Sequence, residues 1–215
     1  MNFQTTPVRS FVASIFAVIL LSSAAAAQTA TQLDLSQVRI KNFGQLDERF
    51  FRGAEPKTLA DFEALKALGV DTIVDLQAKP EREEKGWVES LGMRYVNIPM
   101  IEKKYPRPEH VAEFMKLVDD PSTGEFFVHC AGGRHRTGAV GAVYRYEKYG
   151  WDYDQVYAEM KKFDFYTRWG HGAFKEFVKD YFQQVQQARA AQAPAVKAET
   201  AGAAAAAAVH ADNKH

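Results

Sequence analysis

The sequence has few of the features that would assign a class directly: it has one cysteine and no excess of either charge. A single cysteine among 215 residues excludes an intramolecular disulfide and a zinc site built on several cysteines. Because 27 Lys and Arg residues balance 27 Asp and Glu residues, bulk charge does not favour a nucleic-acid partner. The six histidines show no metal-ligand spacing, which argues against a metal site. We also expect no cofactor.

A long apolar run is also missing, and the first 27 residues are instead typical of a secretory signal peptide. Arg9 precedes an apolar run of 11 residues, Phe11 to Leu21, and small residues follow from Ala24 to Ala27. A membrane-spanning helix needs about 18 apolar residues, so an uncleaved membrane anchor is the weaker alternative. We expect cleavage after Ala27, export to the periplasm or the medium, and no stable membrane span afterwards. A lone thiol in such an oxidising compartment fits a cysteine kept for its reactivity.

Residues 38–187 are expected to form one domain, because strand and helix patterns alternate along them. The alternation predicts an α/β fold with a mainly parallel central sheet flanked by helices. Hydrophobic residues make up 47% of the chain, which is enough for a core. We predict strands at 50–51, 70–76, 94–98 and 126–129, and helices over 59–68, 81–91, 109–118, 136–149, 152–163 and 173–187. The Ala-rich segment 188–215 is predicted to be a disordered tail or, alternatively, an extension of the last helix.

The segment HCAGGRHRTG, residues 129–138, lies where a predicted strand turns into a predicted helix. Backbone N–H groups in such a turn can point toward one centre and form an anion-binding concavity, aided by the positive end of the helix. The paired glycines allow backbone angles that other residues resist, and a phosphate group suits the charge of the site. The residues expected to contact the phosphate are Ala131, Gly132, Gly133, Arg134, His135 and Arg136.

Cys130 lies at the mouth of this turn, and its thiol is the candidate nucleophile. The dipoles that bind phosphate also stabilise a thiolate, and thiols at helix N-termini beside cations have pKa values of about 3.5–7.5. Arg136 can hold two phosphate oxygens with its planar guanidinium, and Thr137 can donate its hydroxyl to the sulfur. His129 is expected to order the loop rather than act as a base, because neighbouring strand residues point to opposite faces. Without these neighbours, Cys130 would ordinarily be interpreted as a small buried apolar residue of the core.

The pattern His-Cys, five residues, Arg-Thr-Gly resembles the signature of the cysteine-based protein tyrosine and dual-specificity phosphatase superfamily. The wider chain, from Asn42 to Phe182, resembles bacterial dual-specificity-type phosphatases, with supporting stretches at 42–44, 51–53, 74–76 and 97–100. This resemblance implies a metal-independent phosphatase that forms a phosphocysteine intermediate. A rhodanese-like sulfurtransferase is a chemical alternative, which the Arg-Thr-Gly run disfavours.

The resemblance also implies a general acid, usually an Asp, on a mobile loop upstream of the cysteine. Here the loop from Met100 to Pro106 contains no Asp, and Glu102, 28 residues before Cys130, is its acidic residue. A carboxylic acid on a partly dehydrating lid can hold its proton near neutral pH. A solvated loop charge is the equal alternative, and Asp119 and Asp120 are further candidates at a helix end.

The expected substrates, by resemblance, are proteins that contain phosphotyrosine, together with the other phosphoproteins on which dual-specificity enzymes act. Inositol polyphosphates or pyrophosphates are the alternative, because the run from Gly133 to Gly138 resembles the loop of plant and fungal atypical dual-specificity phosphatases, and Arg134 suits a polyanion. A non-catalytic phosphate-binding module is the rival from another class. We expect a monomer.

Other residues carry weaker signals. Arg52 and Asp75 occur in the stretches that resemble the family, and structural packing or pairing is their expected role. The aromatic segment 164–171 is expected either to line the pocket entrance or to pack in the core.

Overall fold

The computed structural model describes residues 35–212 of the chain, with side chains for Leu35 and residues 37–192. The predicted signal peptide lies outside these residues, so its cleavage and the export of the chain stay predictions. Within residues 35–212, no helix combines the length and the apolar character needed to cross a membrane.

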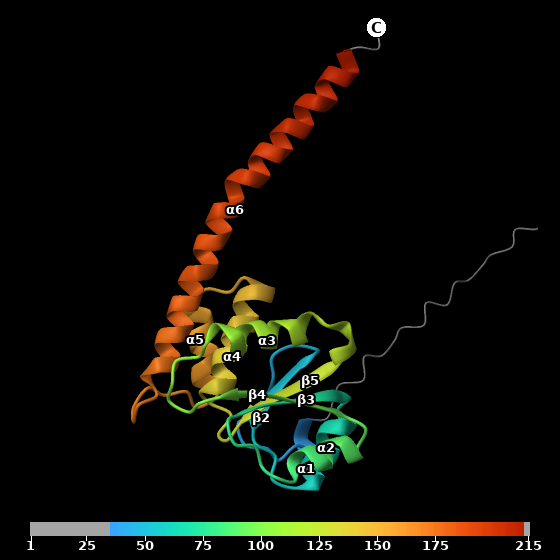
Figure 1. Cartoon of the computed structure of the whole chain (residues 1–215), viewed down its shortest axis with the longest axis vertical. Coiled ribbons are helices and arrows are strands. Elements are labelled where there is room, and N and C mark those ends of the chain that lie inside the picture. Colours follow the sequence, from blue (N-terminus) through green and yellow to red (C-terminus); the bar gives the residue numbers. More distant parts are fainter. Residues whose placement is uncertain (1–34, 213–215) are drawn as a thin grey trace, which may run out of the picture. The chain divides into compact units, whose positions relative to one another are not determined.

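A five-stranded sheet forms the centre of the described domain (Figure 1). Its strands are β1 (Gly44–Gln45), β2 (Phe50–Ala54), β3 (Val70–Gln77), β4 (Arg94–Met100) and β5 (Glu125–Cys130), in the spatial order β1-β2-β5-β3-β4. The pairs β2–β5, β5–β3 and β3–β4 are parallel, and the short β1 is antiparallel to β2. The mainly parallel α/β fold that the sequence predicts is therefore confirmed.

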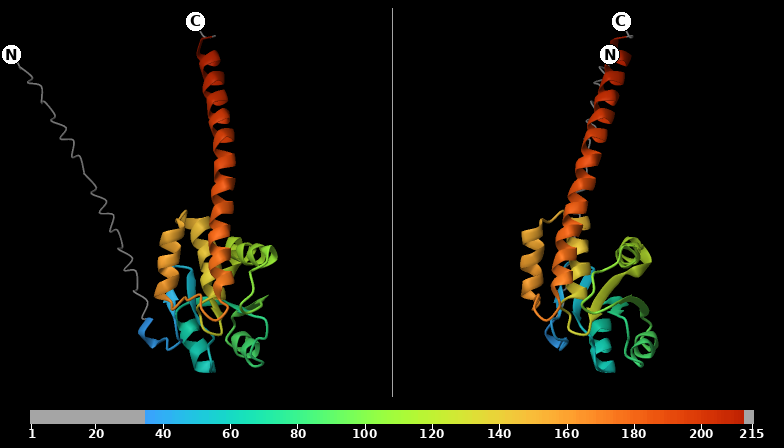
Figure 2. Two further views of the ribbon diagram at one scale, coloured as in Figure 1. Left: turned by 90° about the vertical axis from the view of Figure 1, so that its left-hand side faces the viewer. Right: turned by 60° about the vertical axis from the view of Figure 1, so that its left-hand side comes forward.

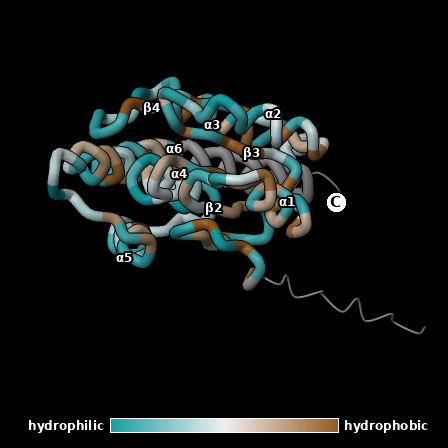
Figure 3. The backbone as a smooth tube through the Cα atoms, turned by 90° about the horizontal axis from the view of Figure 1, so that it is seen from below, coloured by the Kyte–Doolittle hydropathy of each residue, from teal (hydrophilic) through white to brown (hydrophobic). Residues whose placement is uncertain are grey.

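Helices cover both faces of the sheet (Figures 1 and 2). One face carries α1 (Leu59–Ala67) and α2 (Glu84–Ser90), which share a hydrophobic cluster with Phe51, Ile73 and Phe127. The other face carries α3 (Pro108–Asp119), α4 (Arg136–Tyr144), α5 (Tyr153–Lys162) and the first part of α6 (Gly172–Asp212). Strand side chains alternate between these two clusters, and the hydropathy colouring of Figure 3 shows hydrophobic stretches along strands that lie between the helices.

Local sequence signals account for several helix ends. Thr58 and Asp61 form a capping box at the start of α1, and Asp152 and Gln155 form another at the start of α5, as the sequence predicts for the second pair. Gly69 follows α1 with a φ of 91°, a left-handed conformation that favours glycine.

The helices predicted over 136–149 and 173–187 differ in extent from those in the structure. A π-helical segment, η3 (Arg145–Tyr149), follows α4 where a single helix over 136–149 is predicted. α6 continues to Asp212 and so passes through a segment for which a disordered tail is predicted and a helical extension is the alternative. Alanine has the highest helix propensity, and propagating a formed helix costs less than nucleating one, so the extension has a physical reason.

Candidate active site

Cys130 is the last residue of β5, and it lies at the centre of the carboxyl edge of the sheet because β5 lies between β2 and β3. In parallel sheets this edge is where ligands commonly bind. Cys130 belongs to the cluster on the α3–α6 face, whereas His129 contacts Glu84 of α2 on the opposite face. α4 begins at Arg136, so residues 130–136, here called the 130–136 loop, connect the strand end to a helix N-terminus.

A pocket of about 300 Å³ lies beside Cys130. Most of its lining residues are ones that the sequence singles out, and two more come from the segment before α6. The lining consists of Glu102, Cys130, Ala131, Gly132, Arg134, His135, Arg136, Tyr166 and His171. The structure thus brings the candidate nucleophile, the candidate acid and the candidate phosphate-binding arginine to one cavity, whereas Gly133, Thr137 and His129 do not line it.

The surroundings of the Cys130 thiol favour its anion. Burial alone would raise the pKa of the thiol, because a less polar environment disfavours charge. The charge of Arg136 and hydrogen bonds from the Thr137 hydroxyl and from the backbone N–H groups of Thr137 and Gly132 outweigh this effect, so the pKa is lowered. Thr137 Oγ1 is buried and has no oxygen or nitrogen partner within the described residues, which leaves its hydroxyl for the sulfur.

The Arg136 side chain is anchored by hydrogen bonds to backbone carbonyl groups near the ends of two strands. Its Nη1 donates to the carbonyl oxygen of Leu76 in β3 at 3.4 Å and to that of Met100 in β4 at 3.3 Å. The side chain is buried, yet it lines the pocket. A guanidinium fixed in this way can form charge-assisted hydrogen bonds to a bound oxyanion without first being ordered.

Side chains from the N-terminal part of the domain orient the 130–136 loop. Asn42 Nδ2 donates to the carbonyl oxygen of Gly132 at 2.7 Å, and Arg52 Nη2 donates to that of Gly133. Gly133 has a φ of 63°, and a Cβ there would lie 2.5 Å from the Ala54 nitrogen. The Gly133 N–H in turn donates to the Cys130 carbonyl oxygen at 3.2 Å. These contacts fix the turn of the loop, and they give Arg52 the structural pairing expected from the sequence.

His129 belongs to a fully buried polar cluster on the α1–α2 face. Its Nε2 lies 2.7 Å from Glu84 Oε1, and its Nδ1 lies 3.8 Å from Asp75 Oδ1. Burial would lower the pKa of His129, but the hydrogen bond and charge of Glu84, followed by the charge of Asp75, raise it. When protonated, this imidazole lies directly before Cys130 in the chain and adds to the field that favours the thiolate.

The same cluster is the one group of described side chains with the spacing of metal ligands. Ligand atoms of Asp75, Glu84 and His129 lie within 4.8 Å of one another, a grouping that their spacing along the sequence does not reveal. Hydrogen bonds already occupy the Asp75 oxygens, because Oδ1 accepts from the Gln77 N–H at 2.8 Å and Oδ2 accepts from the Tyr95 hydroxyl at 3.0 Å. Charge pairing and hydrogen bonding therefore engage the Asp75 oxygens, whereas Glu84 Oε2 and His129 Nδ1 are buried without a hydrogen-bond partner among the described residues.

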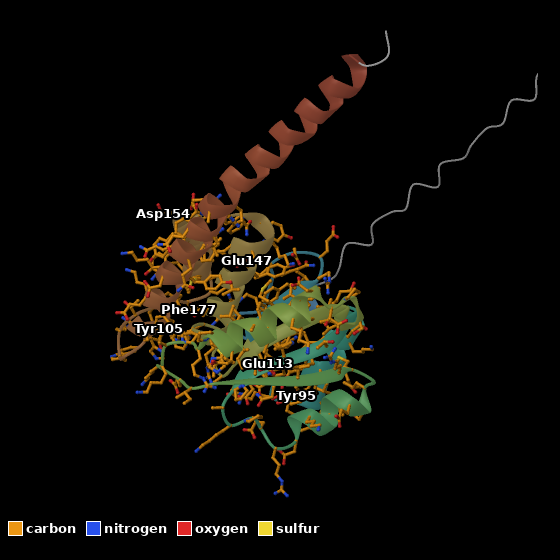
Figure 4. All side chains as sticks on the ribbon, turned by 45° about the horizontal axis from the view of Figure 1, so that its top comes forward. Tyr95, Tyr105, Glu113, Glu147, Asp154 and Phe177 are labelled. Carbon is orange, nitrogen blue, oxygen red and sulfur yellow. The ribbon has the colours of Figure 1, made fainter. Side chains whose placement is uncertain are left out.

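Glu102 lies on the loop that connects β4 to α3, and 63% of its side chain is exposed. Its Oε1 is 3.9 Å from Nε2 of His171, which lines the same pocket. The loop is attached to α6, because the Tyr105 hydroxyl donates to Asp180 at 3.0 Å and the Tyr105 ring packs edge-on against Phe177 (Figure 4).

The other acidic candidates do not line this pocket. Asp119 forms an ion pair with Lys148 and lines a separate cavity. Asp120 accepts a hydrogen bond from the Ser122 N–H at 2.9 Å and lies 3.6 Å from Arg94. Both carboxylates therefore have structural partners of their own.

Two histidines stack in the wall of the pocket, and sequence spacing gives no sign of this. The rings of His135 and His171 are 3.7 Å apart and nearly parallel. Burial and the neighbouring His171 lower the pKa of His135 to about 4, so it is neutral near pH 7. Its Nε2 lies 2.9 Å from the Tyr166 carbonyl oxygen, so this nitrogen carries the proton and donates. The segment 164–171 thus both lines the pocket and packs in the core, where Phe165 is buried.

This fold and this cysteine-containing loop define a cysteine-based phosphatase of the tyrosine and dual-specificity superfamily. The chain belongs to the family described as Swiss Army Knife protein, DSP-PTPase phosphatase domain (PTP-SAK), whose profile matches residues 46–200. The resemblance inferred from the sequence is confirmed, and the chain is a hydrolase of this superfamily.

Individual relatives agree with this assignment. The chain is 27% identical over 129 residues to a protein of Mycosarcoma maydis named as a tyrosine-protein phosphatase, OCA1, and the match covers 57% of this chain and 79% of that protein. The core catalytic domain of the PP-IP phosphatase SIW14 from S. cerevisiae, solved with citrate, has a similar fold, with 18% identity, a TM-score of 0.55, and coverage of 70% of this chain and 93% of that one. TpbA from P. aeruginosa, solved with pTyr, also has a similar fold, with 22% identity and a TM-score of 0.53. The match covers 71% of this chain and 90% of the TpbA chain.

Proposed function

We propose that this chain hydrolyses phosphomonoesters through a phosphocysteine intermediate. The Cys130 thiolate attacks phosphorus in line, the bond to the leaving oxygen breaks, and that oxygen takes a proton from Glu102. In the second step, Glu102 accepts a proton from water, the water oxygen attacks phosphorus, and the sulfur–phosphorus bond breaks to release inorganic phosphate. The observation that carries the proposal is a thiol of lowered pKa in one pocket with Arg136.

Charge on the transferring phosphoryl group would be stabilised by groups that are already in place. Arg136 is anchored to the carbonyl groups of Leu76 and Met100, and the loop backbone lies at the N-terminus of α4. Preorganised donors of this kind stabilise a transition state without the cost of reorganising water. The Thr137 hydroxyl would stabilise the thiolate as it leaves in the second step.

Glu102 is the acid that the geometry supports, although the superfamily usually has Asp. It is the acidic residue among those lining the pocket, and its exposed position on a loop allows it to approach a leaving group. Nε2 of His171 lies 3.9 Å from Glu102 Oε1, which is beyond hydrogen-bond distance.

Phosphotyrosine-containing proteins are the first substrate candidate. Support comes from a curated relative named as a tyrosine-protein phosphatase and from the TpbA structure that contains pTyr. Inositol polyphosphates or pyrophosphates are the second candidate. The PP-IP phosphatase SIW14 supports this class, and so does Arg134, a cation in the pocket lining in addition to Arg136.

Turnover of an aryl phosphate by wild type and Cys130→Ser tests the proposal. An aryl leaving group needs little acid assistance, so the assay reports on the nucleophile. We expect wild-type turnover that survives a strong metal chelator, and no turnover by Cys130→Ser with an unchanged circular dichroism spectrum. Acid-quenched wild-type protein should carry a phosphoryl group on Cys130 by mass spectrometry. Full activity of the serine variant would overturn the mechanism.

The rival proposal is a non-catalytic module that binds phosphorylated ligands. It predicts phosphate binding by wild type together with negligible hydrolysis of the aryl phosphate. The complete set of Cys130, Arg136 and the loop backbone favours the enzyme, and the same assay separates the two proposals.

A further inference from the structure

A second cavity adjoins the candidate active site and has no part in the mechanism above. It measures about 460 Å³ and shares Arg134 and Tyr166 with the pocket beside Cys130. Its remaining wall comes from the end of α5 and from the segment before α6, including Lys161, Arg168 and Trp169. Both cavities fall in the range of about 300–1,000 Å³ that small-molecule sites occupy.

The second cavity is positively charged. Its lining contains three cations, Arg134, Lys161 and Arg168, and one carboxylate, Asp164. Asp164 is 3.4 Å from Arg134 and is itself 59% exposed, so it neutralises at most one of the three. Within the described residues, no carboxylate lies within ion-pair distance of Lys161 or Arg168. The cavity therefore keeps an excess of positive charge that the protein does not balance locally.

Several hydrogen-bond donors in this cavity have no acceptor within the described residues. Nε of Arg134 is buried without a hydrogen-bond partner in the described part of the chain. Lys161 Nζ donates to the Phe165 carbonyl oxygen at 3.0 Å, and two of its three hydrogens remain. Arg168 stacks over Trp169, and its guanidinium carbon lies 4.4 Å from the centre of the Trp169 ring. The same carbon lies 5.4 Å from the centre of the Tyr166 ring. Stacking orients the guanidinium plane but uses none of its five N–H donors.

The backbone that presents Arg168 is strained. Trp169 has a φ of 57°, which is costly for a bulky residue, and 68% of its surface is exposed. Strain of this kind persists where the surroundings fix it, and it is concentrated at ligand-binding sites. The neighbouring Tyr166 is fixed through its carbonyl contact with His135, in the wall of the catalytic pocket. The two cavities thus share Tyr166 as part of their walls.

We propose that Arg134, Lys161 and Arg168 form a second phosphate subsite, which binds another phosphate of a small polyphosphorylated substrate while the scissile phosphate lies at Cys130. The inference rests on the proposed function and narrows its substrate class to inositol polyphosphate-like molecules. A phosphotyrosine residue carries one phosphate and would leave these cations unpaired. A compact polyphosphate presents dense negative charge at two neighbouring positions, which matches two adjoining cavities.

Binding measured in the Cys130→Ser background tests the subsite without turnover. The probes are inorganic phosphate, which needs only the catalytic pocket, and myo-inositol hexakisphosphate, which can reach both. We expect Arg168→Gln to raise the Kd of the hexakisphosphate about tenfold and the double variant with Lys161→Gln to raise it further, because each charge-assisted bond is worth about one such factor. The Kd of inorganic phosphate should stay within about twofold. The matched control is Lys162→Gln, which removes the same charge from an exposed residue outside the cavity lining and should change neither Kd.

Three results would overturn the subsite: equal weakening of both probes by Arg168→Gln, no weakening of the hexakisphosphate, or equal weakening by the Lys162→Gln control. A phosphotyrosine peptide rich in acidic residues serves as a further probe. If Arg168→Gln weakens this peptide as much as the hexakisphosphate, the small-molecule assignment is wrong. Aryl phosphate turnover by the control Lys162→Gln in the wild-type background should be unchanged. Absence of that turnover in wild type would instead contradict the proposed function, so the two failures are distinguishable.

Discussion

Cys130 is surrounded by groups that oppose the effect of its burial. Since Arg136, Thr137 and Gly132 lower its pKa below the ordinary value, the thiolate should persist at pH values where a free cysteine is protonated. We expect the rate of alkylation by iodoacetamide to follow a titration with a midpoint below the about 8.5 of a free thiol. Below that midpoint the thiolate, and with it the alkylation rate, is lost.

Two measurements control this prediction. The urea-unfolded chain should titrate near the value of a free cysteine, and Arg136→Met should move the folded midpoint upward, because it removes the largest stabilising charge. A folded midpoint at or above about 8.5 would contradict the electrostatic account of the site.

Glu102 should matter in proportion to the basicity of the leaving group. We expect Glu102→Gln to lower kcat by about 10²-fold or more for an alkyl phosphate, because general acid catalysis contributes about 10²–10⁴-fold. An aryl phosphate with a good leaving group should lose much less. Asp119→Asn is the matched control, since Asp119 lines a different cavity and pairs with Lys148. A larger loss from Asp119→Asn than from Glu102→Gln would reverse the assignment.

Local spacing identifies the site residues that share one turn of the chain. Cys130 and Arg136 share one turn, so their fixed spacing predicts a common pocket, and they line one. His171 and Glu84 come from segments far from that turn and reach it only through the packing of α6 and α2. The spacing of histidines along the chain carries no information about such contacts.

At the scale of elements, the β5–α4 connection depends on a left-handed glycine pressed against β2. Gly133→Ala would force a Cβ to within 2.5 Å of the Ala54 nitrogen at a φ of 63°. We expect a loss of about 2 kcal/mol or more in the free energy of unfolding, from overpacking and backbone strain together, and weaker competition by inorganic phosphate. Urea denaturation and inhibition assays measure these effects.

Gly132→Ala provides the comparison within the same turn. A Cβ at Gly132 would meet only the flexible Arg134 side chain, at 3.6 Å. The expected destabilisation is below about 0.5 kcal/mol, as for an ordinary surface change. Equal losses from the two substitutions would rule out the close approach of the loop to β2 as the cause.

Helices with strong local signals are predicted better than the order of the strands. The Asp152–Gln155 capping box marks the start of α5 in the sequence and in the structure. α2 begins at Glu84 rather than near residue 81, and its N-cap, Glu83, makes no side-chain hydrogen bond that could fix the boundary. The placement of β5 between β2 and β3 depends on long-range pairing, which no local pattern encodes.

For the whole molecule, α6 connects the body of the domain to the loop that bears Glu102. Phe177 and Asp180 contact Tyr105 of that loop, and Val185 is the last residue of α6 in the hydrophobic core. Arg189 then donates to the Tyr146 carbonyl oxygen of η3. The contacts that the described side chains make with the body therefore end near residue 189.

This distribution of contacts predicts different results for two truncations. Ending the chain after Gln192 should leave the thermal midpoint and aryl phosphate turnover unchanged. Ending it after Gln183 removes Val185 and Arg189, and burial of one valine is worth about 1.5–3 kcal/mol. In a domain of this size that loss should lower the midpoint by about 5 °C or more, while turnover below the transition persists because the contacts of Tyr105 remain. A midpoint that falls equally in both truncations would mean that residues beyond 192 support the domain.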